Sequence, residues 1–210
     1  MLRATKPKES TMTWITQNWT SGQLNALVKK IGGEEVARGI LDGSLVFKIE
    51  KPAVSPLLER LGTSLVLATT GPFVASEKFK LKKDGGICSH LGDDFQSWFL
   101  GKTEEAKGET TLRFARLTRN SLDKPILDEL GDKAETSLAE MFAMMEAQAR
   151  RQESPLLVNI FANTFYIRDA NNVLRVVRAF FVQGGWNVIA FSTYSPGGCS
   201  EGDRIFSRNS

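Results

Sequence analysis

The chain has 210 residues, of which 41% are hydrophobic and 24% are charged, and it carries one histidine and two cysteines. This composition is that of an ordinary soluble globular protein, long enough for a substantial core. Two cysteines allow one disulfide at most, and together with a single histidine they cannot supply the paired ligands of a zinc finger or zinc ribbon. The net charge of +3 is too small to indicate nucleic acid or an anionic membrane by itself.

The first ten residues are polar and basic, and no apolar stretch follows them as in a secretory signal. The longest apolar runs, such as 64–69 and 176–182, fall well short of the roughly 20 residues that span a bilayer. We therefore expect no membrane partner. The absence of a signal and the low cysteine content favour a reducing, cytoplasmic location.

A helical hairpin is predicted over 13–43, after a flexible arm over 1–12. Thr20 and Gln23 have the spacing of a capping box, and Gly32-Gly33 stops the first helix. Glu34 and Glu35 then open a second helix, where negative charge is favourable. The apolar positions of both helices recur at helical spacing: Leu24, Leu27, Val28, Ile31, Val36, Ile40 and Leu41.

A connector is predicted over 44–62, with one short helix around 57–61, and an α+β domain over 63–210. Alternating apolar and polar residues predict a strand from Phe73 to Lys82. Helices are expected over 93–101 and 122–130, with a strand over 111–118 between them.

A second capping box, Ser137 to Glu140, begins the clearest amphipathic helix of the chain. Within the C-terminal segment 156–210, three strands over 157–167, 173–182 and 186–194 form an antiparallel meander. Both faces of these strands carry apolar residues, so the sheet needs cover on both sides. The amphipathic helix can cover one face, and the rest of the chain or a partner must cover the other.

Cys88 and His90 are the only pair in the chain that suggests a thiol nucleophile with its base, because residues two apart on a strand point the same way. Paired carboxylates offer a second route to hydrolysis, but no pair stands out among 24 acidic residues. Gly101-Lys102-Thr103 lacks the earlier glycine and the strand-to-helix context of a phosphate loop. No catalytic residue, metal site or cofactor is assigned.

Two sets of cations are candidate binding residues. Four lysines on the predicted 73–82 strand and just after it are positioned to follow a nucleic-acid backbone: Lys78, Lys80, Lys82 and Lys83. After Lys133 every cation is an arginine, the residue favoured in stacked and paired roles. Because protein interfaces favour tryptophan and arginine, a contact surface is predicted from Arg175, Arg178, Trp186, Arg204 and Arg208.

Several segments resemble a family of uncharacterised bacterial hypothetical proteins. They are the hairpin from Gln23 to Leu45, the stretch from Phe95 to Lys102, the strands around 165–177 and 185–188, and the ending Gly202 to Asn209. The resemblance covers the chain from about residue 14 onward and implies a bacterial origin, with no activity attached. The loop over 196–201 departs from the family pattern.

The sequence predicts an α+β protein with an N-terminal helical hairpin, a mixed α/β core and a C-terminal antiparallel β-meander backed by an amphipathic helix. The favoured function is a non-enzymatic binding or assembly module that contacts a protein partner or further copies of itself. The alternatives are a nucleic-acid-binding protein using the lysine set, and a hydrolase using paired carboxylates or Cys88 and His90.

Overall fold

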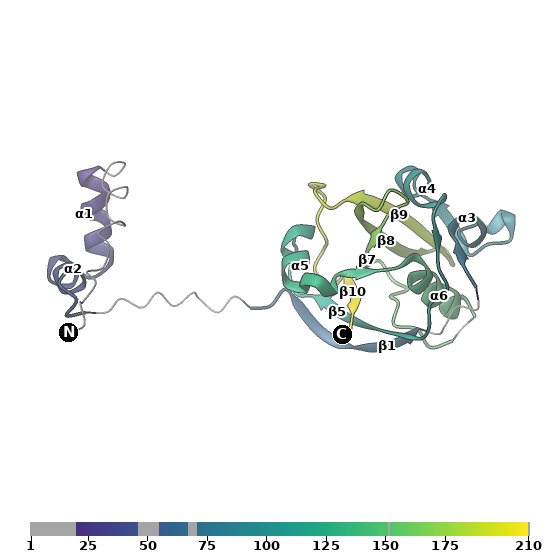
Figure 1. Ribbon diagram of the computed structural model, residues 1–210, viewed down its shortest axis with the longest axis horizontal. Helices are drawn as coiled ribbons and strands as arrows, with labels where there is room; N and C mark the ends of the chain where they lie inside the picture. The colour runs from purple at the N-terminus through teal and green to yellow at the C-terminus, as the bar shows by residue number, and fades with distance from the viewer. Residues whose placement is uncertain (1–19, 46–54, 67–70, 151, 210) are drawn as a thin grey trace, which may run out of the picture. The chain divides into compact units, whose positions relative to one another are not determined.

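The computed structural model describes residues 20–45, 55–66, 71–150 and 152–209, and the chain divides into two units, 1–54 and 55–210 (Figure 1). Each unit is described separately below. The predicted arm over 1–12 and part of the predicted connector lie outside the described residues.

The first unit contains the predicted helical hairpin, made of α1 (Ser21–Lys30) and α2 (Glu34–Leu41). The capping box is confirmed, because the Thr20 side chain accepts from the Gln23 backbone N–H and Gln23 accepts from the Thr20 N–H. Gly33 precedes α2 with φ of 99°, a conformation that glycine adopts without strain. The two helices are therefore set by local signals that the sequence displays.

The second unit is built on one eight-stranded mixed sheet. Seven strands lie in the order β1 (Leu58–Val66), β5 (Thr110–Leu117), β10 (Arg204–Arg208), β7 (Asn163–Arg168), β8 (Leu174–Val182), β9 (Gly185–Ser192) and β3 (Cys88–Leu91). The eighth, β6 (Glu135–Thr136), pairs with β7. Neighbours are antiparallel except for β10–β7, β6–β7 and β3–β9. A separate two-stranded ladder joins β2 (Phe73–Val74) and β4 (Thr103–Glu104).

The predicted C-terminal meander is confirmed as β7, β8 and β9. Its first strand starts at Asn163 rather than at residue 157, because the Asn163 side chain accepts from the Leu157 N–H and donates to the Leu157 carbonyl. Those two hydrogen bonds hold the preceding residues in a loop. The last strand, β10, was not predicted and lies between β5 and β7.

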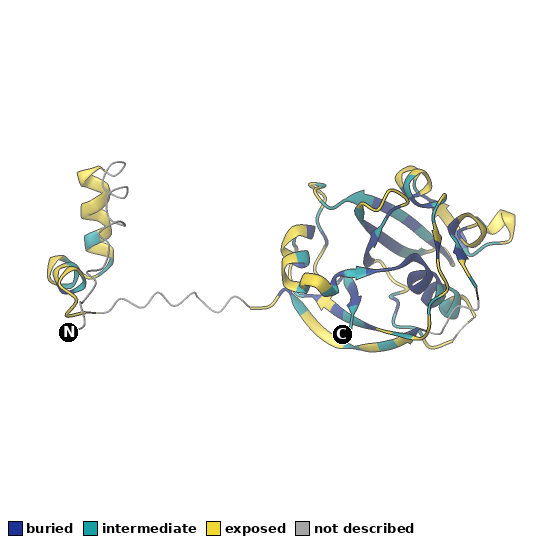
Figure 2. Cartoon of the chain, viewed as in Figure 1, coloured by how far each residue is buried: buried dark blue, intermediate teal, exposed yellow. Residues whose placement is uncertain are grey.

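Helices and loops of the same unit cover both faces of the sheet. The helix α6 (Leu138–Ala149), with its capping box confirmed, packs its buried Met141 and Met145 into the larger core. Two shorter helices line that core, α3 (Ala75–Lys78) and α4 (Asp93–Phe99). A smaller core on the other face contains Ile126 of α5 (Asp123–Leu130). Figure 2 shows the central strands dark blue, which marks them as buried.

Two predicted elements are wrong. The short helix around 57–61 is instead the start of β1. The N–H groups of Leu57, just before the strand, and of Leu58, its first residue, donate to the Glu129 carboxylate. The strand over 73–82 is a two-residue strand, the helix α3 and a 3₁₀ turn over Lys82–Asp84. Ala75 and Phe79 are both buried, and a spacing of four residues satisfies a helix as well as a strand.

Candidate functional site

A cluster of buried polar side chains lies in the smaller core, where α5 meets the sheet. Asp123 at the start of α5 is 1% exposed, and its Oδ1 accepts a hydrogen bond of 3.0 Å from the Tyr166 hydroxyl. Arg178 on β8 places Nη2 3.5 Å from Asp123 Oδ2 and 3.3 Å from Cys199 Sγ. The Cys199 thiol lies 3.6 Å from Asp123 Oδ1. Two strands and a loop, distant in sequence from α5, thus meet at the carboxylate of Asp123.

Burial raises the pKa of the Asp123 carboxyl, and the Arg178 charge opposes that shift. Burial also raises the pKa of the Cys199 thiol to about 12. A thiol with such a pKa is almost wholly protonated at neutral pH, so Cys199 is a poor nucleophile. Within the described residues, Asp123 Oδ2 and Arg178 Nε are buried and lack hydrogen-bond partners. Because buried polar groups are normally hydrogen-bonded, the folded protein depends on the ion pair between these two side chains.

Cys88 and His90 do not form a nucleophile and base pair. The Cys88 side chain is buried in the larger core, whereas His90 is exposed. The register of β3 against β9 shifts between them, since Cys88 pairs with Trp186 and His90 with the next residue, Asn187. This bulge adds one residue to β3 and breaks the strand alternation on which the predicted pair depends. Burial raises the pKa of the Cys88 thiol to about 12.

Both thiols are therefore expected to be unreactive in the native protein. At pH 8, a thiol-specific disulfide reagent should modify neither cysteine of the folded chain, and both after unfolding in denaturant. The release of the chromophore from the reagent measures this directly. A cysteine that reacts in the native protein at the rate of the unfolded chain would contradict the burial described above.

Four of the five buried carboxylates accept hydrogen bonds from the backbone, and no two of the five are paired for hydrolysis. Glu104 accepts from the N–H groups of Leu138 and Ala139, in the first turn of α6. Asp203 accepts from the N–H groups of Ala162 and Ser200. Hydrogen bonds also occupy the other three buried carboxylates: Asp123, Glu140 and Asp169. These acids serve to fix loops and a helix end.

The four lysines of the nucleic-acid hypothesis do not share a strand face. Lys78 ends α3, Lys80 follows it, and Lys82 and Lys83 lie in the 3₁₀ turn. All four are exposed, and Lys82 Nζ donates to the Gly184 carbonyl at 2.5 Å. The regular spacing along a phosphate backbone that motivated the hypothesis is therefore absent from this segment.

The arginines of the predicted contact surface are separated in space and engaged within the unit. Arg175 pairs with Asp169 and stacks over Trp98 at 3.9 Å from the ring centroid. Arg208 pairs with Glu140, and Arg178 joins the Asp123 cluster. Trp186 is 0% exposed and belongs to the larger core, so it cannot act as an interface anchor. Arg204 remains at the edge of a surface hollow.

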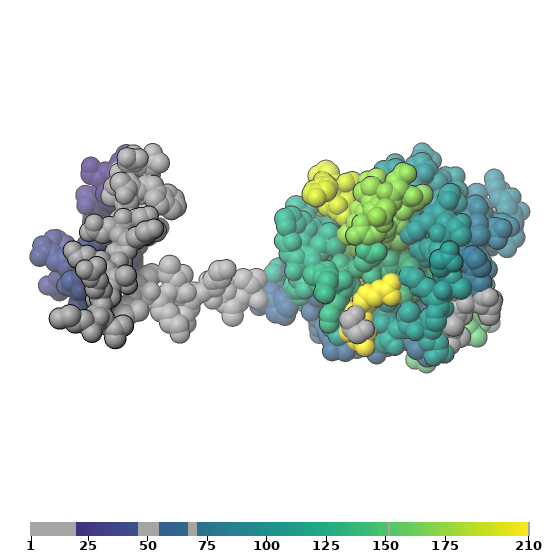
Figure 3. Space-filling model, in the orientation of Figure 1, coloured from purple at the N-terminus to yellow at the C-terminus, as the bar shows by residue number. Residues whose placement is uncertain are grey.

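The sequence leaves open whether a partner or the rest of the chain covers the second apolar face of the meander. In the structure, the second unit itself covers this face. Tyr166, Val176 and Ile205 are buried against α5 and the loop around Cys199. Tyr194, in the segment that leads to Cys199, is exposed. Figure 3 shows the light-green and yellow segments near residues 180–200 at the surface. This sheet face therefore gives no support to an assembly role.

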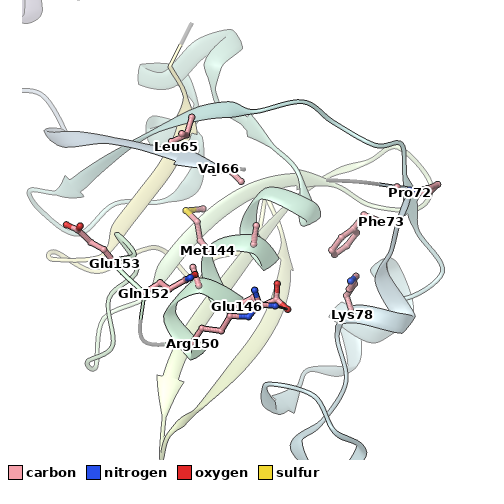
Figure 4. Close-up of a pocket in the computed structure, with 13 residues that line it drawn as sticks. Leu65, Val66, Pro72, Phe73, Lys78, Met144, Glu146, Arg150, Gln152 and Glu153 are labelled. Atoms are coloured by element: carbon pink, nitrogen blue, oxygen red, sulfur yellow. Dashed lines mark ion pairs between the residues drawn. The ribbon is translucent and has the colours of Figure 1, made fainter. Parts of the chain in front are cut away.

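Besides the hollow at Arg204, two others in the second unit carry mixed side chains. The larger, about 550 Å³, has the buried Phe73 and Met144 in its wall and the Glu146–Arg150 ion pair of α6 at its rim (Figure 4). The smaller, about 410 Å³, includes His90, Asp93 and Lys80. Across the described ranges, no three His, Cys, Asp or Glu side chains are grouped to hold a metal ion.

The hairpin of the first unit leaves its apolar stripe uncovered. Among residues 20–45 only Gly39 is buried. Leu24 and Leu27 of α1 are exposed, and Leu41 at the end of α2 is 73% exposed. In Figure 2 both helices are almost entirely yellow and teal. The sequence identifies this stripe, but its exposure is visible only in the structure.

Comparison of the chain with protein-family models, curated proteins and solved structures finds no match. None of the described helices is long and apolar enough to cross a membrane.

Proposed function

We propose that this chain is a non-enzymatic assembly module in which the hairpin joins two copies of the chain. The observation that carries the proposal is the exposure of four leucines of the hairpin and the turn after it, Leu24, Leu27, Leu41 and Leu45. Isolated helices of 10 and 8 residues are marginal in water and normally owe their stability to the packing of an apolar face. These leucines therefore need a second surface to cover them.

A second hairpin fits this requirement by charge as well as by shape. The helix α1 carries Lys29 and Lys30 and no acidic residue. The helix α2 with its C-cap carries Glu34, Glu35 and Asp42 against one arginine. A two-fold arrangement sets α1 of one copy against α2 of the other, so each contact brings opposite charges together. Two hairpins packed in this way form a small four-helix bundle.

Exposed ion pairs contribute little energy, about 0–1 kcal/mol each, so the leucines supply the affinity and the charges supply the orientation. Burying a leucine side chain fully contributes about 1.5–3 kcal/mol. The four leucines of each copy are 38–73% exposed, so covering them contributes the corresponding part of that free energy against the entropy of association.

The double substitution Leu24→Glu/Leu27→Glu is expected to weaken self-association about 100-fold, or about 2.7 kcal/mol, because it places charges within the apolar contact. Sedimentation equilibrium of the full chain over a concentration series measures this. The native chain should reach the mass of two copies, and the variant should remain at the mass of one.

The matched control is Asn25→Glu/Ala26→Glu, which adds the same charge to α1 away from the leucines. It should self-associate like the native chain. Thermal unfolding of the second unit should be unchanged in both variants. A native chain that has the mass of one copy at every concentration would refute the proposal, and so would equal weakening by the two variants.

A further inference from the structure

A surface hollow of about 460 Å³ lies at one end of the sheet in the second unit. Strands β1, β5 and β10 contribute Leu61, Arg116 and Arg204 to its lining. The loop before β7 and the segment before β10 complete it with Leu157, Asn159, Phe161, Glu201 and Gly202. Apolar side chains and two arginines thus line the same hollow.

The two arginines occupy directly opposed positions on neighbouring strands, because Arg116 pairs with Arg204 in the β5–β10 register. Like charges at opposed positions destabilise a sheet unless an anion offsets them. The nearest carboxylate oxygens to Arg116 belong to Glu59 and Glu201, at 4.0 and 3.9 Å, beyond hydrogen-bond distance. Arg116 donates no hydrogen bond to any residue in the described ranges.

Arg204 is also incompletely satisfied. Its Nη1 donates to the Pro155 carbonyl, while its Nε has no partner in the described part of the chain. The guanidinium lies over the Phe114 ring at 5.2 Å from the centroid, and Arg204 forms no ion pair with a carboxylate in the described part of the chain. A carboxylate between the two arginines would accept from both and remove their mutual repulsion.

Exposed apolar side chains accompany the lining of the hollow. Leu61, which lines it, is 45% exposed, and Val158 and Ile160, which alternate along the chain with lining residues, are 48% and 87% exposed. The loop that carries the last two is held by hydrogen bonds from Leu157 and Phe161 to the side chains of Asn163 and Asn159. Exposed apolar side chains around a preformed hollow are typical of a recognition surface rather than of a solvated loop.

We propose that this hollow binds the C-terminal end of a peptide whose last residue is apolar. The terminal carboxylate lies between Arg116 and Arg204, and the last side chain packs against Leu61 and Phe161. Bidentate pairing with guanidinium groups suits a planar carboxylate. Glu201, in the same lining, disfavours ligands that carry a second negative charge.

The test titrates the full chain, labelled with ¹⁵N, with the acetylated tetrapeptide Gly-Ala-Val-Leu as its free acid and as its C-terminal amide. The free acid should shift the backbone signals of 157–161 and of Arg116 and Arg204, and should bind at least tenfold more tightly than the amide. Equal binding of acid and amide, or no shift at millimolar peptide, would overturn the proposal. The same shifts with acetate alone at equal concentration would overturn it too.

The variant Arg116→Gln should weaken binding of the free acid at least tenfold and leave the weak binding of the amide unchanged. Arg116 is half-exposed and makes only distant ion pairs, so this change should not unfold the sheet. Lys124→Gln removes the same charge from α5 and should not affect peptide binding. Equal loss in both variants would show a general effect of charge and contradict the site.

Discussion

Replacing Asp123 with alanine is expected to lower the free energy of unfolding by about 3–5 kcal/mol, because it leaves Arg178 buried and without its carboxylate. The Tyr166 hydroxyl and the Cys199 thiol lose their acceptor in the same step. Urea unfolding followed by circular dichroism measures the change. A loss below about 1 kcal/mol would show that the cluster is not buried as described, since exposed pairs contribute that little.

The double variant Asp123→Leu/Arg178→Met tests whether the loss comes from the unpaired charge. Replacing both members of a buried ion pair with apolar residues of similar volume is often nearly neutral or stabilising. We therefore expect the double variant to be more stable than Asp123→Ala. A double variant as unstable as the single one would assign the loss to packing instead.

The pH dependence of the free energy of unfolding tests the direction of the pKa shift of Asp123. Burial holds its pKa in the folded chain above the ordinary value of 3.8. The folded state then binds the proton more tightly than the unfolded state. Protonation of Asp123 therefore makes its full contribution to the free energy of unfolding below pH 3.8. It is lost as the pH rises through the folded pKa. The stability of the native chain relative to Asp123→Asn should therefore fall with rising pH, and a rise would contradict the direction of the shift.

Replacing Trp186 with alanine is expected to lower the free energy of unfolding of the second unit by about 3–5 kcal/mol. The side chain is fully buried and packs edge-on against Phe181, with ring centroids 5.1 Å apart. Removing it opens a cavity that the neighbouring strands β8 and β3 cannot close completely. Self-association through the hairpin should be unchanged in sedimentation equilibrium at temperatures where the variant is folded.

Trp186→Phe provides the matched control. Phenylalanine fills much of the same space, and it removes an indole N–H that has no partner among the described residues. The loss should therefore stay below about 1.5 kcal/mol. If Trp186→Ala left the stability unchanged and weakened association instead, the assignment of this residue to the core would be wrong.

The elements that could be predicted from the sequence are those with local signals. The capping boxes at Thr20 and Ser137 locate α1 and α6, because both partners of each box lie within four residues. The meander follows from short turns between apolar runs. In contrast, β1 shows little alternation, because it is an edge strand and only Val66 is buried. Its pairing with β5 depends on residues about 50 positions away.

The candidate sites were harder to predict because they depend on register and on long-range contacts. The bulge that separates Cys88 from His90 has no sequence signal of its own. Asp123 has the position of an ordinary first-turn acid, and its contact with Cys199 joins residues 76 positions apart. Arg116 and Arg204 become neighbours only because β10 is inserted beside β5. The uncovered stripe of the hairpin, by comparison, can be identified from helical spacing.

Cross-linking in a mixture of two isotopes tests the assembly account most directly. Equal amounts of unlabelled and ¹⁵N-labelled full chain are mixed, allowed to exchange, and treated with a zero-length reagent that joins lysines to carboxylates. The account predicts cross-linked peptides between Lys29 or Lys30 and Glu34 or Glu35, about half of them carrying one labelled and one unlabelled partner. Cross-links between these residues that carry only one isotope would place the contact within a single copy and contradict the account.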